Sequence, residues 1–145
     1  MATPLPSLDR PTRWALALGA VGVAGVLATA GWLEPDPRGY GTHLRLGLPP
    51  CAFLVMTGCR CPSCGMTTAF SCTMRGRFHA AWRANPAGSL LASSCAVLVP
   101  WMLAAAVGGR PWGFRTLEKP LTVVGVAAVA LSLVAWTVRL LLGGR

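Results

Sequence analysis

Three long apolar runs dominate the pattern of this chain. They cover residues 14–33, 88–107 and 121–138, and none of them contains a charged residue. As a helix rising about 1.5 Å per residue, each run is long enough to cross a hydrocarbon layer about 30 Å thick. Tryptophans stand near the ends of the runs, where an indole suits the membrane interface. They are Trp14, Trp32, Trp101, Trp112 and Trp136. The pattern predicts an all-α membrane protein with three transmembrane helices.

Proline and asparagine mark the ends of these helices. Asn85-Pro86 and Lys119-Pro120 predict the starts of the second and third spans, because asparagine caps free amides and proline suits the first helical turn. The segment 34–39, with two prolines and a glycine, ends the first span.

Two features leave alternatives open within this outline. Pro100 predicts a kink in the second span, unless residues 101–107 form a separate interfacial turn. Residues 1–11 form a predicted flexible tail, although Arg10 and Arg13 with the small residues 28–30 also resemble a cleavable signal peptide. The length of the apolar stretch favours a retained span.

Apolar residues recur every fourth position after a cysteine-rich turn between the first two spans. They are Met66, Phe70, Met74, Phe78 and Trp82. This spacing predicts an amphipathic interfacial helix that Gly76 bends or interrupts. Residues 51–57 are apolar but too short to cross a membrane, so we expect an interfacial or re-entrant piece. The whole chain, 1–145, is interpreted as one membrane domain, with the cysteine loop and amphipathic helix at 50–84.

Composition supports the membrane assignment and excludes several classes of function. Of 145 residues, 54% are apolar and 12% are charged, far below the roughly 25% charged residues of soluble chains. The net charge of +9 is spread over the loops, so we expect contacts with lipid headgroups and none with nucleic acid. The four acidic residues are scattered along the chain, which argues against paired acid–base catalysis.

Small residues follow the spans at helical spacing. They are Ala20, Ala24 and Ala28, Ser89 and Ser93, and Gly125 and Ala128. Such faces let helices approach closely in lipid, which predicts a compact bundle and favours a homo-oligomer or a place in a larger membrane complex.

Cysteines supply the one constellation that points to chemistry. Five of the six lie between the first two spans: Cys51, Cys59, Cys61, Cys64 and Cys72. The sixth, Cys95, lies within the second span and is interpreted as a small buried residue. The run Cys61-Pro62-Ser63-Cys64-Gly65 is the most specific element, because proline fixes a turn and glycine can adopt positive φ.

Three interpretations of this cluster remain. The favoured one is a knuckle in which Cys61 and Cys64 bind zinc, and the remaining ligands of a four-coordinate site come from the other loop cysteines or a second copy of the chain. Those other candidates are Cys51, Cys59 and Cys72, with His79 a weaker one.

The second interpretation is a redox dithiol. Cys61 and Cys64 would stand at a helix N-terminus and exchange electrons through a quinone, in an architecture that resembles the disulfide-forming oxidases of bacterial membranes. The third is a loop stapled by two disulfides, Cys51 with Cys72 and Cys59 with Cys61 or Cys64. Orientation stays open, because the tail and second loop carry five Lys and Arg residues while the first loop and C-terminus carry eight.

The residues around this turn resemble a known family. Residues 58–69 read G-C-R-C-P-S-C-G-M-T-T-A, followed by Arg75-Gly76-Arg77, Ala80 and Asn85-Pro86. This pattern is similar to a bacterial family of small membrane proteins, domain of unknown function 2752, with the signature C-P-x-C-G-x-T-R-A and a later Asn-Pro. The resemblance covers roughly residues 50–92 and implies a multi-pass protein of the bacterial cytoplasmic membrane. Its defining positions here are Cys61, Pro62, Cys64, Gly65, Thr67, Asn85 and Pro86.

One position departs from the signature, since Thr68 stands where the family has arginine. Any role of that cation would pass to Arg60 or Arg75. The resemblance implies no established activity. We expect a non-enzymatic membrane subunit or assembly factor with a metal-binding or structural cysteine knuckle. The alternatives are a membrane thiol–disulfide oxidoreductase that uses Cys61 and Cys64, and an inert accessory subunit of a larger membrane complex.

Overall fold

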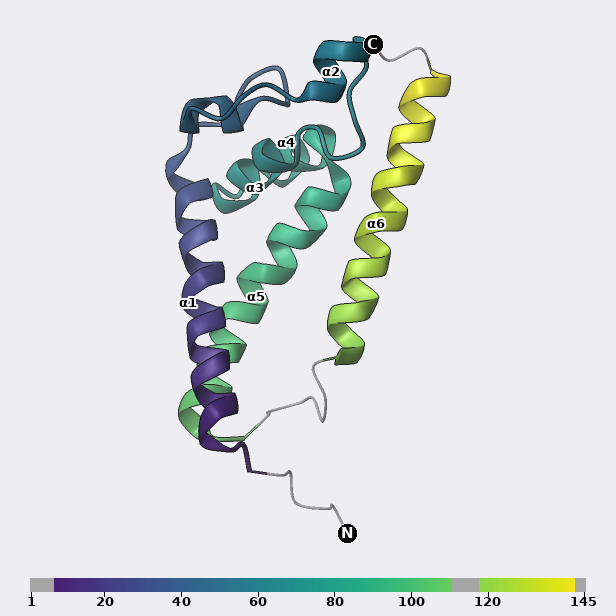
Figure 1. The fold of residues 1–145 in the computed structure, drawn as a ribbon. Coiled ribbons are helices and arrows are strands. Elements are labelled where there is room, and N and C mark those ends of the chain that lie inside the picture. Colours follow the sequence, from purple (N-terminus) through teal and green to yellow (C-terminus); the bar gives the residue numbers. More distant parts are fainter. Residues whose placement is uncertain (1–6, 111–117, 143–145) are drawn as a thin grey trace.

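The computed structural model describes residues 7–110 and 118–142, and its regular elements in these ranges are all helical (Figure 1). They are α1 (Arg10–Trp32), the short 3-10 helix η1 (Thr42–Leu46), α2 (Ala52–Thr57), α3 (Met66–Met74), α4 (Phe78–Ala84), α5 (Pro86–Gly108) and α6 (Glu118–Leu141). The predicted all-α fold class is confirmed.

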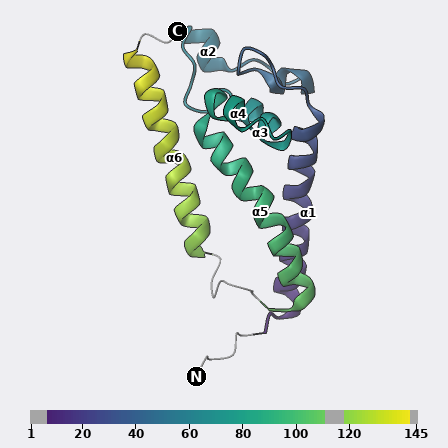
Figure 2. The same cartoon turned by 180° about the vertical axis from the view of Figure 1, so that it is seen from behind.

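Three of the helices are long and apolar enough to cross a membrane. They are α1, α5 and the part of α6 over Thr122–Leu141. No more than 22% of the most apolar stretch of each helix is buried inside the protein. Their apolar side chains therefore face outward, as contact with lipid requires. In Figures 1 and 2, α5 lies between α1 and α6 and packs against both.

The first span begins earlier than its apolar run. Helix α1 starts at Arg10, so the end of the predicted tail is helical. Pro11 is compatible with this start, because the amide that proline lacks has no acceptor in the first helical turn. Residues 1–6 of the predicted tail, and Trp112, lie outside the described residues.

The second span begins as predicted. Asn85 caps α5, and its Oδ1 accepts a hydrogen bond from the amide of Gly88 at 3.0 Å. The helix continues through Pro100 to Gly108 without a break. The alternative of a separate interfacial turn at 101–107 is therefore wrong.

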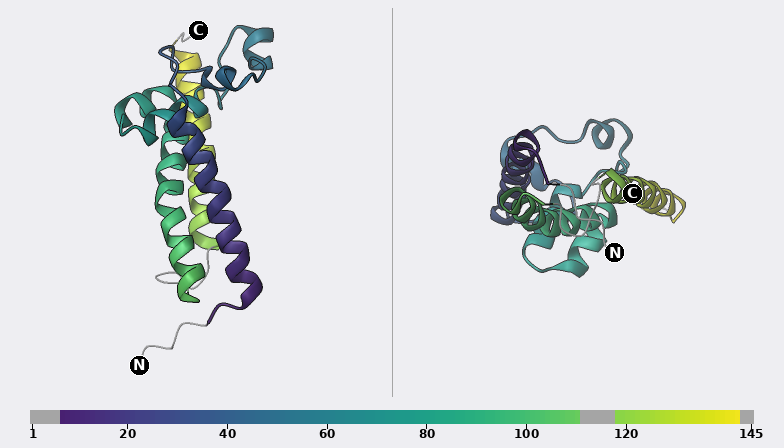
Figure 3. Two further views of the ribbon diagram at one scale, coloured as in Figure 1. Left: turned by 90° about the vertical axis from the view of Figure 1, so that its left-hand side faces the viewer. Right: turned by 90° about the horizontal axis from the view of Figure 1, so that it is seen from below.

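The predicted amphipathic helix is two short helices. Gly76, with φ +70°, separates α3 from α4. Both lie across one end of the long helices and extend sideways from them (Figure 3). Helix α3 packs against α1 and α5, and α4 packs against α3 and α5. A core of small residues joins them: Ala69, Cys72, Ala81 and Ala84.

Close packing uses only part of the small-residue pattern. Ala20 is fully buried, and Ser89 and Ala128 are nearly so. Ala28 and Gly125 are exposed. The small faces therefore support the contacts α1–α5 and α5–α6 over short stretches.

Arginines close the C-terminal ends of two spans. Arg13 of α1 donates from Nε to the carbonyl of Ala106 at 2.7 Å and from Nη2 to that of Val107 at 3.0 Å, at the end of α5. Arg75, just after α3, donates to the carbonyl of Leu33 at the end of α1. The last carbonyls of a helix have no partner within it, and a guanidinium also complements the helix dipole. These bonds tie α1 to α5 at one end and to α3 at the other.

Candidate metal centre

The two cysteines of the C-P-S-C run lie on a tight turn that leads into α3. The amide of Cys64 donates to the carbonyl of Cys61 at 3.0 Å, and the amide of Met66 donates to that of Ser63 at 3.1 Å. Proline at position 62 suits such a turn because its φ is fixed near −65°. The turn brings the two sulfur atoms to 3.3 Å from each other.

Gly65 follows the turn and caps α3 with φ +88°. A Cβ at this position would lie 2.6 Å from the carbonyl oxygen of Gly39 and 2.7 Å from that of Ala84. Both neighbours are backbone atoms and cannot turn aside. Glycine is required by φ and by space, so the glycine of the signature has a physical reason.

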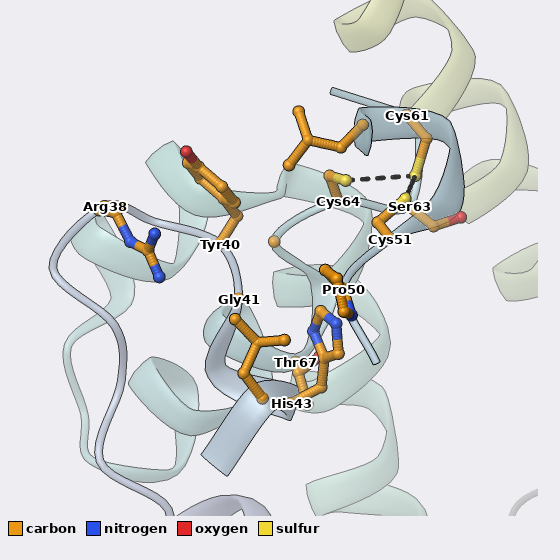
Figure 4. Close-up of a pocket in the computed structure, with 13 residues that line it drawn as sticks. Arg38, Tyr40, Gly41, His43, Pro50, Cys51, Cys61, Ser63, Cys64 and Thr67 are labelled. Atoms are coloured by element: carbon orange, nitrogen blue, oxygen red, sulfur yellow. Dashed lines mark hydrogen bonds between the residues drawn. The ribbon is translucent and has the colours of Figure 1, made fainter. Parts of the chain in front are cut away.

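Cys51 comes to the same point from another segment. It is the residue before α2, and Gly58, with φ +69°, follows the last residue of that helix and ends it. The Sγ atoms of Cys51 and Cys61 are 3.6 Å apart. Figure 4 shows the sulfur atoms of Cys51, Cys61 and Cys64 pointing toward one another.

The spacing of these three thiols fits one metal ion. All three sulfur atoms lie within 4.8 Å of one another. Thiolates bound to a tetrahedral zinc ion at about 2.3 Å lie about 3.8 Å apart. A disulfide requires about 2.05 Å between sulfurs, and all six cysteines are free thiols in the structure. Neither predicted disulfide pair is formed.

The surroundings shift the pKa values of two of the thiols in opposite directions. The pKa of Cys51 is lowered, chiefly by a hydrogen bond from the backbone of Leu54 in the first turn of α2. Burial raises the pKa of Cys64 to about 12. An isolated Cys64 would therefore stay protonated, whereas a bound cation would favour its thiolate form.

The other predicted ligands lie apart from this group. Cys59 donates its amide to Thr57 Oγ1 at 3.2 Å but is not among the three clustered thiols. Cys72 is 4% exposed within the α3–α4 core, where burial raises its pKa. Cys95 lies on α5, and His79 is exposed on α4. The structure thus brings together three of the five predicted cysteine ligands.

His43 is a residue that the sequence analysis did not single out. It lies on η1 and lines a cavity of about 320 Å³ together with all three clustered cysteines (Figure 4). Its imidazole is half-buried and makes no hydrogen bond or ion pair with another described residue. A lone histidine in a loop gives no signal in a single sequence, so only the fold reveals this placement.

Asn85, at the start of α5, holds the cysteine turn by hydrogen bonds. Its Nδ2 donates to the carbonyl of Pro62 at 3.0 Å and to that of Cys64 at 3.2 Å, while its Oδ1 caps α5. The side chain is 1% exposed, so every polar atom of the amide is used inside the protein. One residue therefore joins the turn to a membrane-spanning helix.

Helix α6 holds the turn from the side. Ser132 Oγ donates to the carbonyl of Pro62 at 2.9 Å, and Trp136 Nε1 donates to that of Arg60 at 2.8 Å. The Trp136 ring also packs edge-on against Phe53 of α2, with centroids 6.5 Å apart. Both segments that supply cysteines thus contact α6.

The position that departs from the signature is buried. Thr68 is 1% exposed, and its Oγ1 lies 2.8 Å from Thr42 Oγ1. Of the two arginines expected to replace the missing cation, Arg75 binds the end of α1. Arg60 stacks on the ring of Tyr40, with its guanidinium carbon 4.2 Å from the centroid.

The chain matches a known family over part of its length. A family described as a protein of unknown function (DUF2752) matches residues 51–99. No curated protein and no solved structure matches the chain. The matched segment runs from Cys51 into α5 and includes the clustered thiols, Gly65 and Asn85. The resemblance found in the sequence is thereby confirmed, and residues 51–99 are similar to this family of unknown function.

Proposed function

We propose that this chain is a non-enzymatic integral membrane protein, a subunit or assembly factor, whose clustered thiols bind a zinc ion. The observation that carries the proposal is the grouping of three sulfur atoms, from two separate segments, within 4.8 Å of one another. Thiolates favour zinc over the hard cations that prefer oxygen ligands. Bound zinc would supply a positive charge shared by Cys51, Cys61 and Cys64, and would hold α2 against the turn.

His43 is the residue that we assign to the fourth position of the site, although it lies outside the group of three sulfur atoms that are within 4.8 Å of one another, so η1 would have to move toward the thiols when metal binds. It lines the cavity on which the three thiols open, and its imidazole has no competing partner among the described residues. Its helix η1 lies between Gly41 and Gly47, with φ of +89° and +75°. A Cys₃His set is a common structural zinc site.

The redox interpretation also has an observation in its favour. Cys61 and Cys64 are 3.3 Å apart, so a small movement would permit a disulfide. Forming it releases two protons and two electrons, which a membrane quinone would accept. Cys51 distinguishes the two functions, because a zinc site needs this third thiol and a Cys61–Cys64 dithiol does not.

The test compares Cys51→Ser with Cys59→Ser, a control in the same loop but outside the cluster. The full chain is purified in detergent and loaded with Co²⁺, which reports thiolate ligands by their charge-transfer absorption. We expect one cobalt ion per chain in the wild type and the control, and loss of binding in Cys51→Ser. Zinc content by elemental analysis should follow the same order.

Two outcomes would reject the metal site. One is a protein without bound metal whose thiols at positions 61 and 64 titrate freely. The other is a Cys51→Ser protein that still forms a Cys61–Cys64 disulfide and passes electrons to a quinone, which would favour the oxidoreductase.

A further inference from the structure

A second cavity lies on the same side of the bundle as the cysteine site, and arginines line it. Its volume is about 690 Å³, and its walls come from the segment after α1, from the cysteine loop, from α3 and from α4 with the residue before it. Its charged lining residues are Glu34, Asp36, Arg38, Arg60, Arg77 and Arg83. We call it the arginine cavity.

Both carboxylates of the arginine cavity already have partners. Asp36 Oδ2 accepts from Arg38 Nη2 at 2.7 Å, and this bond holds the pKa of Asp36 at about 2. Glu34 Oε2 accepts from Arg45 Nη1 at 3.0 Å. Each acid therefore already pairs with one arginine.

Three arginines of the cavity have no carboxylate. Arg77 and Arg83 make no side-chain hydrogen bond or ion pair with any other residue that the structure describes. Arg60 stacks on Tyr40 and donates to the carbonyl of Arg38 at 3.4 Å. Arg77 and Arg83 are exposed, so their guanidinium groups are accessible to an anion from outside the protein. Their planar donors match the oxygens of a phosphate group.

The exposed aromatic residues of α4 favour a lipid as the source of that phosphate. Phe78 and Trp82 stand one turn apart and are 59% and 54% exposed. Ala80 and Ala84, on the opposite side of the helix by its period, line the arginine cavity. Helices α3 and α4 extend sideways at the end of the spans (Figure 3). If the spans cross a bilayer, a helix in that position would lie near the membrane surface, where exposed aromatic side chains are favoured.

We propose that the arginine cavity binds the phosphate of an anionic phospholipid headgroup, while Phe78 and Trp82 enter the lipid beside it. The guanidinium groups without a carboxylate partner supply the positive charge that binds the phosphate. The exposed aromatic pair anchors α4 in the lipid layer. A site for soluble phosphate would have no use for that pair. This proposal does not depend on metal at the cysteine cluster.

The test uses the full chain in detergent, with phosphatidylglycerol as the probe and native mass spectrometry as the readout. The variant is Arg77→Gln with Arg83→Gln. The matched control, Arg10→Gln with Arg110→Gln, removes the same charge at the opposite end of the bundle. We expect phosphatidylglycerol to bind the variant about 30-fold more weakly, and the control as the wild type does.

Two further measurements distinguish a lipid phosphate from a soluble one, and a loss of binding from a loss of fold. Circular dichroism checks that the double variant is still helical. Arg83→Gln alone should give an intermediate loss of affinity for phosphatidylglycerol. Equimolar inorganic phosphate should leave the lipid in place. Equal losses in variant and control, or displacement by inorganic phosphate, would overturn the proposal, the second in favour of a soluble anion.

Discussion

Asn85 shows how one buried side chain can serve both fold and site. It caps α5 with its oxygen and holds the carbonyls of Pro62 and Cys64 with its nitrogen. The sequence predicted the cap, because Asn-Pro is a local signal. It did not predict the two bonds to the turn, because they join residues 21 and 23 positions away.

Asn85→Ser separates these two roles. Serine still caps a helix, but it has no amide to donate to the carbonyls of the turn. We expect unchanged helicity by circular dichroism. Metal affinity, measured by competition with a chelator, should be about 10- to 100-fold weaker, because residues that orient metal ligands contribute that much to binding. Asn85→Ala should lose about 1 kcal/mol more in stability, because the cap is gone as well. Wild-type affinity in Asn85→Ser would mean that the turn does not need this support.

The cysteines show what spacing alone can predict. Cys61 and Cys64 lie on one short turn, so their convergence follows from local geometry. Cys72 points into the α3–α4 core because it shares a helix face with Ala69, three residues earlier, and helix packing decides which face is covered. Cys51 and His43 line the cavity from two other segments, which end at Gly58 and Gly47, and local spacing does not predict that these segments meet the cysteine turn.

At the scale of elements, the helices were largely predictable and their mutual contacts were not. Apolar length predicts α1, α5 and α6, and Gly76 predicts the break between α3 and α4. Docking of α6 on the cysteine turn depends on two polar side chains, Ser132 and Trp136. Within an apolar run, a serine is also expected as a small packing residue and a tryptophan as an interfacial one. The sequence therefore does not predict their bonds to the cysteine turn.

Trp136→Phe tests this docking. Phenylalanine keeps the ring contact with Phe53 but cannot donate to the carbonyl of Arg60. We expect a loss of about 1 kcal/mol, measured by thermal unfolding in detergent. Ser132→Ala is the matched control and should lose less, because Asn85 still donates to Pro62. The reverse order would show that the bond to Arg60 does not hold the turn.

At the scale of the whole molecule, the two ends of the bundle differ. The end formed by the C-terminus of α1, the N-terminus of α5 and the C-terminus of α6 carries the cysteine site and the arginine cavity. At the opposite end, Arg13 ties α1 to the C-terminus of α5. The cysteine cluster, the arginine cavity and helix α4 therefore lie at the same end of the bundle.

The central claim is that Cys51, Cys61 and Cys64 share one metal ion, with His43 in the fourth position. X-ray absorption at the zinc edge of the purified full chain tests it most directly. We predict three sulfur neighbours at about 2.3 Å and one nitrogen neighbour at about 2.0 Å, with the nitrogen signal lost in His43→Ala. Four sulfur neighbours would contradict the role of His43, and a protein that retains no zinc would contradict the metal site itself.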